Sequence, residues 1–177
     1  MHTLTSILLL TTLLLAPLSV MAKLPAGLKT VGQGDAFYLS VIKVYNASLA
    51  VGNNATRTNV LEADVSRCLT LDYAVDLSAD KFALAADTIL KRQHDTATLQ
   101  SINPQLAQLH NAYQDVKVGD IYQMCYDAKQ QTTRLLLNDK PLTSVKSAEF
   151  ANVYFGIWLG EKQPITQALR ESLLKGL

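Results

Sequence analysis

The chain has few of the residues that build common catalytic and metal centres. Its 177 residues include only three histidines and two cysteines. The sequence contains no HExxH signature, no Gly-x-Ser-x-Gly elbow, no P-loop and no dinucleotide-binding glycine pattern. The two cysteines are too far apart for a CxxC redox pair and too few for a thiolate metal cluster. The sequence therefore predicts neither a metal site nor a bound cofactor.

Long runs of like charge are also missing. Sixteen Lys and Arg residues nearly balance fifteen Asp and Glu residues, which leaves a net charge of +1. Nucleic acid binding demands a basic face, so this balance argues against a nucleic acid partner. No polybasic segment is present that could attract an anionic membrane surface.

One apolar run stands at the N-terminus. Residues 8–15 are almost entirely apolar, and Pro17 and the small residue Ala22 follow. This pattern predicts a signal peptide, residues 1–22, and a single mature domain, residues 23–177, in the periplasm or outside the cell. The run is too short to cross about 30 Å of hydrocarbon, so we expect no stable membrane span after cleavage.

Cys68 and Cys125 each lie in an apolar, strand-like segment. An oxidising compartment permits a disulfide between two strands, which is one interpretation of the pair. Two buried thiols without a bond are the other. The sequence leaves both interpretations open.

The first half of the mature chain has the pattern of strands followed by helices. β-Branched and aromatic residues predict one strand over residues 37–49 and a second over residues 67–75. Ser78 is typical of a helix N-cap, and apolar residues at helical spacing follow it. Asn103 and Pro104 predict the cap and first turn of a second helix.

The second half repeats this order. Strands are predicted over residues 121–126, 132–137 and 142–145, with a polar turn at residues 138–140. Ser147 and Thr166 are typical caps of two further helices. The order of strands, helices, strands and helices predicts an α+β fold with an antiparallel sheet rather than a parallel βαβ series.

The helix after Ser147 is the most apolar segment of the mature chain and holds the only tryptophan. Phe150, Val153, Tyr154, Ile157 and Trp158 follow the i, i+3, i+4, i+7, i+8 spacing of one wide apolar stripe. Such a stripe packs against another element, so we expect this helix to lie against the sheet.

Five short segments carry a resemblance to a known family. They are Val44-Tyr45, Gly119-Asp120, Leu137-Asn138, the run Tyr-Phe-Gly-Ile-Trp-Leu-Gly at 154–160 and the run Leu-Arg-Glu-Ser-Leu-Leu at 169–174. In this order, across residues 24–176, they resemble the bacterial chalcone isomerase-like proteins. The resemblance implies the chalcone isomerase fold, which is a large curved antiparallel sheet with a layer of helices on one face and a ligand cleft between them.

The resemblance also implies where an enzyme of this family would hold its substrate. The plant enzymes close a chalcone into a flavanone by intramolecular addition, and their site stabilises charge on the carbonyl oxygen. They use an arginine before the first long strand, a threonine within it, a tyrosine and an asparagine around the first helix, and a hydroxyl residue on the late helix. In this chain the threonine matches Ser40, the tyrosine matches Ser78, the asparagine matches Ala85 and the late-helix hydroxyl residue matches about Ala151. No arginine stands at the first position, where the nearest cation is Lys29. We therefore expect no chalcone isomerase activity.

Seven tyrosines carry the remaining functional signal. A tyrosine can pack its ring and offer its hydroxyl to a ligand. We expect a noncatalytic protein that binds a small apolar or amphipathic molecule between sheet and helices, and known relatives of this fold make a fatty acid-like ligand the natural choice. The predicted ligand-binding residues are Tyr38, Ser40, Tyr45, Tyr73, Tyr113 and Tyr154.

Two alternatives stay open. The first is an active isomerase or intramolecular lyase that uses Ser40 with Tyr45 or Tyr73. The second is a protein-interaction module whose cleft is filled by its own side chains. Bound small molecules in the natively purified protein would distinguish the ligand-binding protein from this second alternative.

Overall fold

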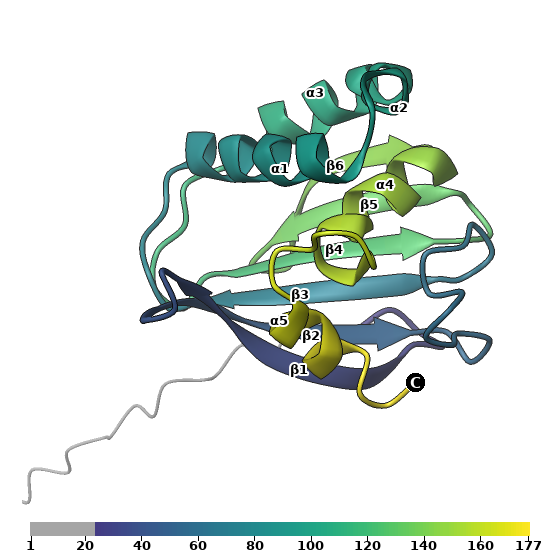
Figure 1. Ribbon diagram of the computed structural model, residues 1–177, viewed down its shortest axis with the longest axis horizontal. Coiled ribbons are helices and arrows are strands. Elements are labelled where there is room, and N and C mark those ends of the chain that lie inside the picture. The colour runs from purple at the N-terminus through teal and green to yellow at the C-terminus, as the bar shows by residue number, and fades with distance from the viewer. Residues whose placement is uncertain (1–23) are drawn as a thin grey trace, which may run out of the picture.

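The computed structural model describes residues 24–177, so the predicted signal peptide, residues 1–22, lies outside the described residues. Six strands form one curved sheet in the order β1-β2-β3-β4-β5-β6, and every neighbouring pair is antiparallel. Helices cover one face of this sheet (Figure 1). The predicted α+β fold is confirmed.

Along the chain, three strands followed by helices occur twice. The strands are β1 (Lys29–Tyr38), β2 (Ile42–Val51), β3 (Arg67–Tyr73), β4 (Ile121–Asp127), β5 (Thr132–Leu137) and β6 (Lys140–Lys146). The helices are α1 (Ala79–Gln93), α2 (Thr96–Ser101), α3 (Asn103–Ala112), α4 (Ala148–Leu159) and α5 (Gln167–Leu173). Helices α1 to α3 therefore interrupt the sheet between β3 and β4, and α4 and α5 follow its last strand.

The predicted helix caps of the second half are confirmed. The Ser147 hydroxyl accepts a hydrogen bond from the backbone N–H of Phe150 at 3.0 Å and begins α4. The Thr166 hydroxyl accepts from the backbone N–H of Leu169 at 3.1 Å and begins α5. Each cap satisfies one of the free N–H groups of a helix start, which is why Ser and Thr mark these positions in the sequence.

The prediction of one strand over residues 37–49 is wrong. This segment contains the end of β1, a turn, and most of β2, because the chain reverses at Leu39 and Ser40. The backbone N–H of Val41 closes the turn on the carbonyl of Tyr38 at 3.2 Å. No Gly, Pro, Asn or Asp occupies the turn, so the sequence carries only the weak signal of Ser40.

The helical insertion also differs in detail from the prediction. It contains three helices rather than two, because the short helix α2 lies between the two that were predicted. Asp95 is the N-cap of α2, and its carboxylate accepts from the backbone N–H of Thr98 at 2.8 Å. The N-cap position of α3 is Ile102, and the predicted cap Asn103 is already helical, with proline in the first turn.

The core lies between the sheet and α4. Residues 153–159 of α4 are all buried, as are Phe150 and Ala151, so this helix is enclosed on nearly every side. Leu49, Leu69 and Leu135 from three strands belong to the same buried cluster. The predicted contact of the aromatic helix with the sheet is confirmed.

Cys68 and Cys125 form a disulfide between β3 and β4, where they stand directly opposite each other. They alternate with core residues along both strands, so the bridge lies on the sheet face opposite the helices, which we call the outer face. The bridge joins residues 57 positions apart. A loop of that length corresponds to about 4 kcal/mol in the chain-entropy view of disulfide stabilisation.

Glycines in β1 admit α5 at close range. A Cβ atom at Gly32 would stand 2.2 Å from the Leu173 carbonyl oxygen, and one at Gly34 would stand 2.8 Å from Cβ of Ser172. The glycine-rich opening of the first long strand therefore serves helix packing. Within residues 24–177 no helix combines the length and the hydropathy needed to cross a membrane.

Candidate functional site

The structure brings four of the six predicted ligand-binding residues together between the sheet and the helices. These four residues, the tyrosine cluster, are Tyr45 on β2, Tyr73 on β3, Tyr113 at the end of α3 and Tyr154 on α4. Tyr45, Tyr73 and Tyr154 are buried, while Tyr113 is partly exposed. The rings of Tyr45 and Tyr73 meet edge to face with their centroids 5.5 Å apart.

Hydrogen bonds link some of the hydroxyl groups of the cluster. The Tyr113 and Tyr154 hydroxyls are 2.5 Å apart. The indole N–H of Trp158 donates to the Tyr45 hydroxyl at 3.0 Å. None of the hydrogen bonds within residues 24–177 uses the Tyr73 hydroxyl, which leaves a polar group in the layer open to a further partner.

The cluster disfavours negative charge. Burial raises the pKa of Tyr45 to about 12 even though the Trp158 hydrogen bond opposes the shift. Burial likewise raises the pKa values of Tyr73 and Tyr154 well above their ordinary value, and neighbouring tyrosines add to the effect. All of these hydroxyls are therefore neutral donors and acceptors at physiological pH.

Two aromatic residues that were not among the predicted ligand-binding residues complete the layer. Phe82 of α1 lies 5.5 Å from the ring of Tyr73 and 5.4 Å from the ring of Tyr122, measured between centroids. The Tyr122 hydroxyl is already engaged, because it donates to the Gln114 carbonyl at 3.0 Å and accepts from the Gln114 N–H at 2.8 Å. Tyr122 and Met124 are two residues apart on β4, so they point to the same face of the sheet. This period of two is the sequence signal that could have placed Tyr122 on the helix-facing side.

His110 stands at the edge of the layer. Its ring stacks on Tyr113 with centroids 6.1 Å apart, and its Nδ1 lies 3.9 Å from a carboxylate oxygen of Asp87. Burial lowers the pKa of His110, with the nearby Asp87 acting in the opposite direction. The buried Nε2 has no hydrogen-bond partner among the described residues.

Tyr38 and Ser40 lie outside this layer. Both belong to the turn region between β1 and β2, and the Tyr38 side chain is 61% exposed. The prediction placed them on a continuous strand with Tyr45, and the unexpected chain reversal removes them from it. Ser40 therefore does not share a site with Tyr45 and Tyr73 as the catalytic alternative requires.

A buried arginine was missed by the sequence analysis. Arg67 is fully buried, and its guanidinium lies 4.7 Å from the ring centroid of Tyr126 and 4.9 Å from that of Phe155. It donates to the carbonyls of residues 60, 62 and 65 and to the Asn152 side chain. Burial lowers its pKa to about 10, which leaves it charged at neutral pH. These contacts hold the 52–66 loop against the sheet and use both terminal nitrogens of the guanidinium, whereas its buried Nε has no partner among the described residues.

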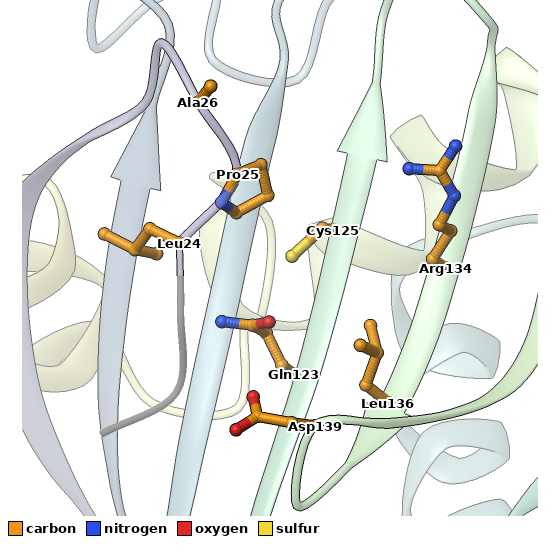
Figure 2. Close-up of a pocket in the computed structure, with 8 residues that line it drawn as sticks. All are labelled: Leu24, Pro25, Ala26, Gln123, Cys125, Arg134, Leu136 and Asp139. Atoms are coloured by element: carbon orange, nitrogen blue, oxygen red, sulfur yellow. The ribbon is translucent and has the colours of Figure 1, made fainter. Parts of the chain in front are cut away.

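Aromatic rings pack against one another in the layer between sheet and helices. The two hollows described within residues 24–177 both lie elsewhere. The larger, of about 560 Å³, lies on the outer face (Figure 2). Its lining consists of Leu24, Pro25 and Ala26 from the segment before β1, Gln123 and Cys125 of β4, Arg134 and Leu136 of β5, and Asp139. A ligand in the tyrosine cluster would have to displace side chains that now pack together.

The family model that matches this chain gives the class of protein. The chain belongs to the chalcone isomerase-like family, whose profile matches residues 28–175. A comparison with curated protein sequences gave no match.

Solved structures extend the likeness. The crystal structure of a fatty-acid binding protein of Arabidopsis thaliana has the same fold, with a TM-score of 0.64. The likeness covers 85% of this chain and 88% of the plant chain, at 15% sequence identity. The TM-score shows a shared fold, and at this identity the likeness shows the fold alone.

Proposed function

We propose that this protein is an exported, noncatalytic member of its family that binds a small amphipathic molecule, with a fatty acid-like chain, between the sheet and the helices. The tyrosine cluster is the observation that carries the proposal. It places hydroxyl groups inside an aromatic layer, where an apolar chain could pack on rings and a polar end could bind hydroxyls. The fold shared with a plant fatty-acid binding protein supports the choice of ligand class.

The cluster favours a neutral polar end on the ligand. Both terminal nitrogens of the Arg67 guanidinium already donate to three carbonyls and to Asn152, so Arg67 cannot offer its two-pronged end to a carboxylate. The raised pKa values of Tyr45, Tyr73 and Tyr154 indicate an environment that disfavours negative charge. A protonated carboxylic acid or an alcohol fits these donors and acceptors better than an ionised carboxylate does.

The packed aromatic layer supports one alternative, a protein-interaction module that holds no ligand. The isomerase alternative has less support, since Ser40 lies in an exposed turn apart from Tyr45 and Tyr73. Its matched late-helix position, Ala151, is fully buried and carries no hydroxyl. Addition of a chalcone to the protein should leave the spontaneous rate of ring closure unchanged, as followed by near-ultraviolet absorbance.

Trp158 provides a built-in test of ligand binding. It is the only tryptophan, and its indole N–H contacts the Tyr45 hydroxyl of the cluster. Protein of residues 23–177, which contain every described element, should be purified natively and its bound molecules identified by mass spectrometry after extraction. Titration with dodecanoic acid should then change the Trp158 emission and saturate, and the affinity should rise as the pH is lowered and the acid becomes neutral.

Two tyrosine variants give a matched comparison. Tyr73→Phe removes a hydroxyl that has no partner within the described residues, so it should weaken ligand binding and leave the thermal midpoint unchanged or slightly higher. Tyr122→Phe removes a hydroxyl that the Gln114 backbone already uses, so it should lower the thermal midpoint and leave the affinity unchanged. An empty extract together with no saturable change in Trp158 emission would contradict the proposal and favour the interaction module.

A further inference from the structure

The turn between β1 and β2 exposes an unusual concentration of apolar side chains. We define the hairpin tip as residues 37–42. Its exposed large hydrophobic residues are Phe37 at 47%, Tyr38 at 61%, Leu39 at 73%, Val41 at 76% and Ile42 at 50%. Burial in the core therefore does not account for these residues.

A neighbouring loop adds to the apolar character of this end of the sheet. Val118, in the loop before β4, is 66% exposed. The next residue in this loop, Gly119, donates to the Tyr73 carbonyl, while Ala74 donates to the Val44 carbonyl on the adjoining strand. The tip and the Val118 loop thus lie at the same end of the sheet (Figure 1).

The backbone conformation of the tip is unfavourable for the residues that occupy it. Leu39 and Ser40 have φ angles of 49° and 62°, in the left-handed region that favours Gly and Asn. A leucine in this conformation is unfavourable for the turn, and at 73% exposure it adds little to the core. Since neither the turn nor the core explains Leu39, a contact with another molecule is the remaining physical reason for an apolar residue there.

The charges around the tip are compensated. Residues 36–42 contain no ionisable side chain except the phenol of Tyr38. At the base of the hairpin, Lys43 and Asp35 form an ion pair with an N–O distance of 2.9 Å, and Asn46 donates to the same carboxylate. The tip can therefore enter an apolar medium without the dehydration of an unpaired charge.

We propose that the hairpin tip inserts into the interface of a lipid bilayer and holds the protein on the membrane surface. Stable interfaces between proteins use about 20 to 30 residues on each side, and six residues at a convex turn offer far less. A bilayer needs no complementary shape, because each apolar side chain contributes by its own burial. The uncharged tip complements the hydrocarbon boundary and does not depend on anionic lipid.

This docking would also place the tyrosine cluster near the source of an amphipathic ligand. Tyr45 follows Ile42 by three residues on β2, or about 10 Å along the strand. This consequence rests on the proposed ligand function, whereas vesicle binding by the tip does not. Failure of one can therefore be distinguished from failure of the other.

Flotation with phosphatidylcholine vesicles tests the proposal directly. Protein of residues 23–177 should float with these vesicles, and added phosphatidylglycerol or salt should change the bound fraction little. The variant with Leu39→Asn and Ser40→Gly should bind about tenfold more weakly, the change expected when one leucine no longer enters the bilayer. Leu84→Asn on α1, where the leucine is 62% exposed, is the matched control and should bind as the parent does.

Two further measurements keep the result interpretable. The thermal midpoint of the Leu39 and Ser40 variant should be no lower than that of the parent, so weaker flotation would not reflect unfolding. Val41→Ser, which leaves the turn residues in place, should also weaken flotation. Absence of parent protein from the floated fraction, or equal flotation of parent and tip variants, would overturn the proposal, as would a dimer in gel filtration that the tip variants abolish.

Discussion

The tyrosine cluster and the hairpin tip use similar residues in opposite ways. Tyr154 is 1% exposed and its hydroxyl meets that of Tyr113, whereas Tyr38 is 61% exposed at the turn. The two regions are joined by a short stretch of one strand, β2. In the cluster, aromatic residues support the fold and leave one hydroxyl for a ligand. At the tip they contribute little to the fold, which is why we assign the tip to an external contact.

This contrast separates two sources of functional signal. Within the cluster, function is inferred from a polar group that has no hydrogen-bond partner among the described residues, the Tyr73 hydroxyl. At the tip, it is inferred from residues that packing and turn geometry both disfavour, such as Leu39. Substitutions of cluster hydroxyls that already have partners, such as that of Tyr45, should therefore lower stability, and substitutions at the tip should leave it unchanged or raise it.

The largest expected effect is on stability at alkaline pH. The four cluster tyrosines have folded-state pKa values above the unfolded value of about 10, so their stabilising effect is complete below pH 10 and is lost as the pH rises through the folded values. Ionisation of each tyrosine in the unfolded state alone lowers the unfolding free energy by at most about 1.4 kcal/mol for each pH unit above 10, so the free energy should fall steadily there. Urea unfolding at a series of pH values, with tyrosinate absorbance as a second probe, measures this. A flat profile above pH 10 would contradict the assigned burial.

A smaller effect is expected from Arg67, which contacts α4 and lies at the opposite end of β3 from Tyr73. Arg67→Met should lower the unfolding free energy by about 3 kcal/mol, because the carbonyls of residues 60, 62 and 65 lose their donor inside the protein. Arg134→Met is the matched control on the exposed outer face, and it should change stability by less than about 0.5 kcal/mol. Denaturant titration of both variants makes the comparison, and equal losses would rule out the special role of Arg67.

A pair of tyrosine substitutions compares the two regions with the same chemistry. Tyr45→Phe should cost about 1 to 3 kcal/mol, since the buried Trp158 N–H loses its acceptor. Tyr38→Phe at the tip should change the unfolding free energy by less than about 0.5 kcal/mol. Thermal unfolding followed by circular dichroism distinguishes them, and a costly Tyr38→Phe would show that the tip does support the fold.

The smallest effect has the opposite sign. Leu39→Asn with Ser40→Gly should raise the unfolding free energy by about 1 kcal/mol, because these residues suit positive φ angles. Asn138→Leu in the β5–β6 turn is the reciprocal change, and it should destabilise the protein, since the Asn138 side chain accepts from the Ile121 N–H at 2.9 Å. Denaturant midpoints compare the two variants. Destabilisation by the tip substitutions would remove the turn argument for an external contact.

The two hairpin turns also explain why the sequence predicted one and missed the other. Asn138 and Asp139 have φ angles of 50° and 64°, and both residue types tolerate this region, so the turn was recognisable from its composition. Leu39 and Ser40 adopt nearly the same angles without that composition. The apolar residues on both sides then resembled one uninterrupted strand, which placed Tyr38 and Ser40 in the wrong region.

The candidate site was predictable to a similar degree. Tyr45, Tyr73, Tyr113 and Tyr154 were singled out because tyrosines are amphipathic and occur on elements that could face one another. Arg67 was not singled out, because a buried arginine without a carboxylate partner has no sequence signature. Its acceptors are carbonyls of the 52–66 loop. The state of Cys68 and Cys125 also needed strand register, which a single sequence does not fix.

The sequence by itself determined the α+β order of elements, the caps at Ser147 and Thr166, the aromatic helix and the family, because periodicity, capping and short motifs are local properties. Only the tertiary structure decided which tyrosines meet and that residues 37–42 form an exposed tip. These facts depend on the register of the strands and on the turn at Leu39 and Ser40. In this turn, pairing across the sheet prevailed over the local backbone preference of the two residues.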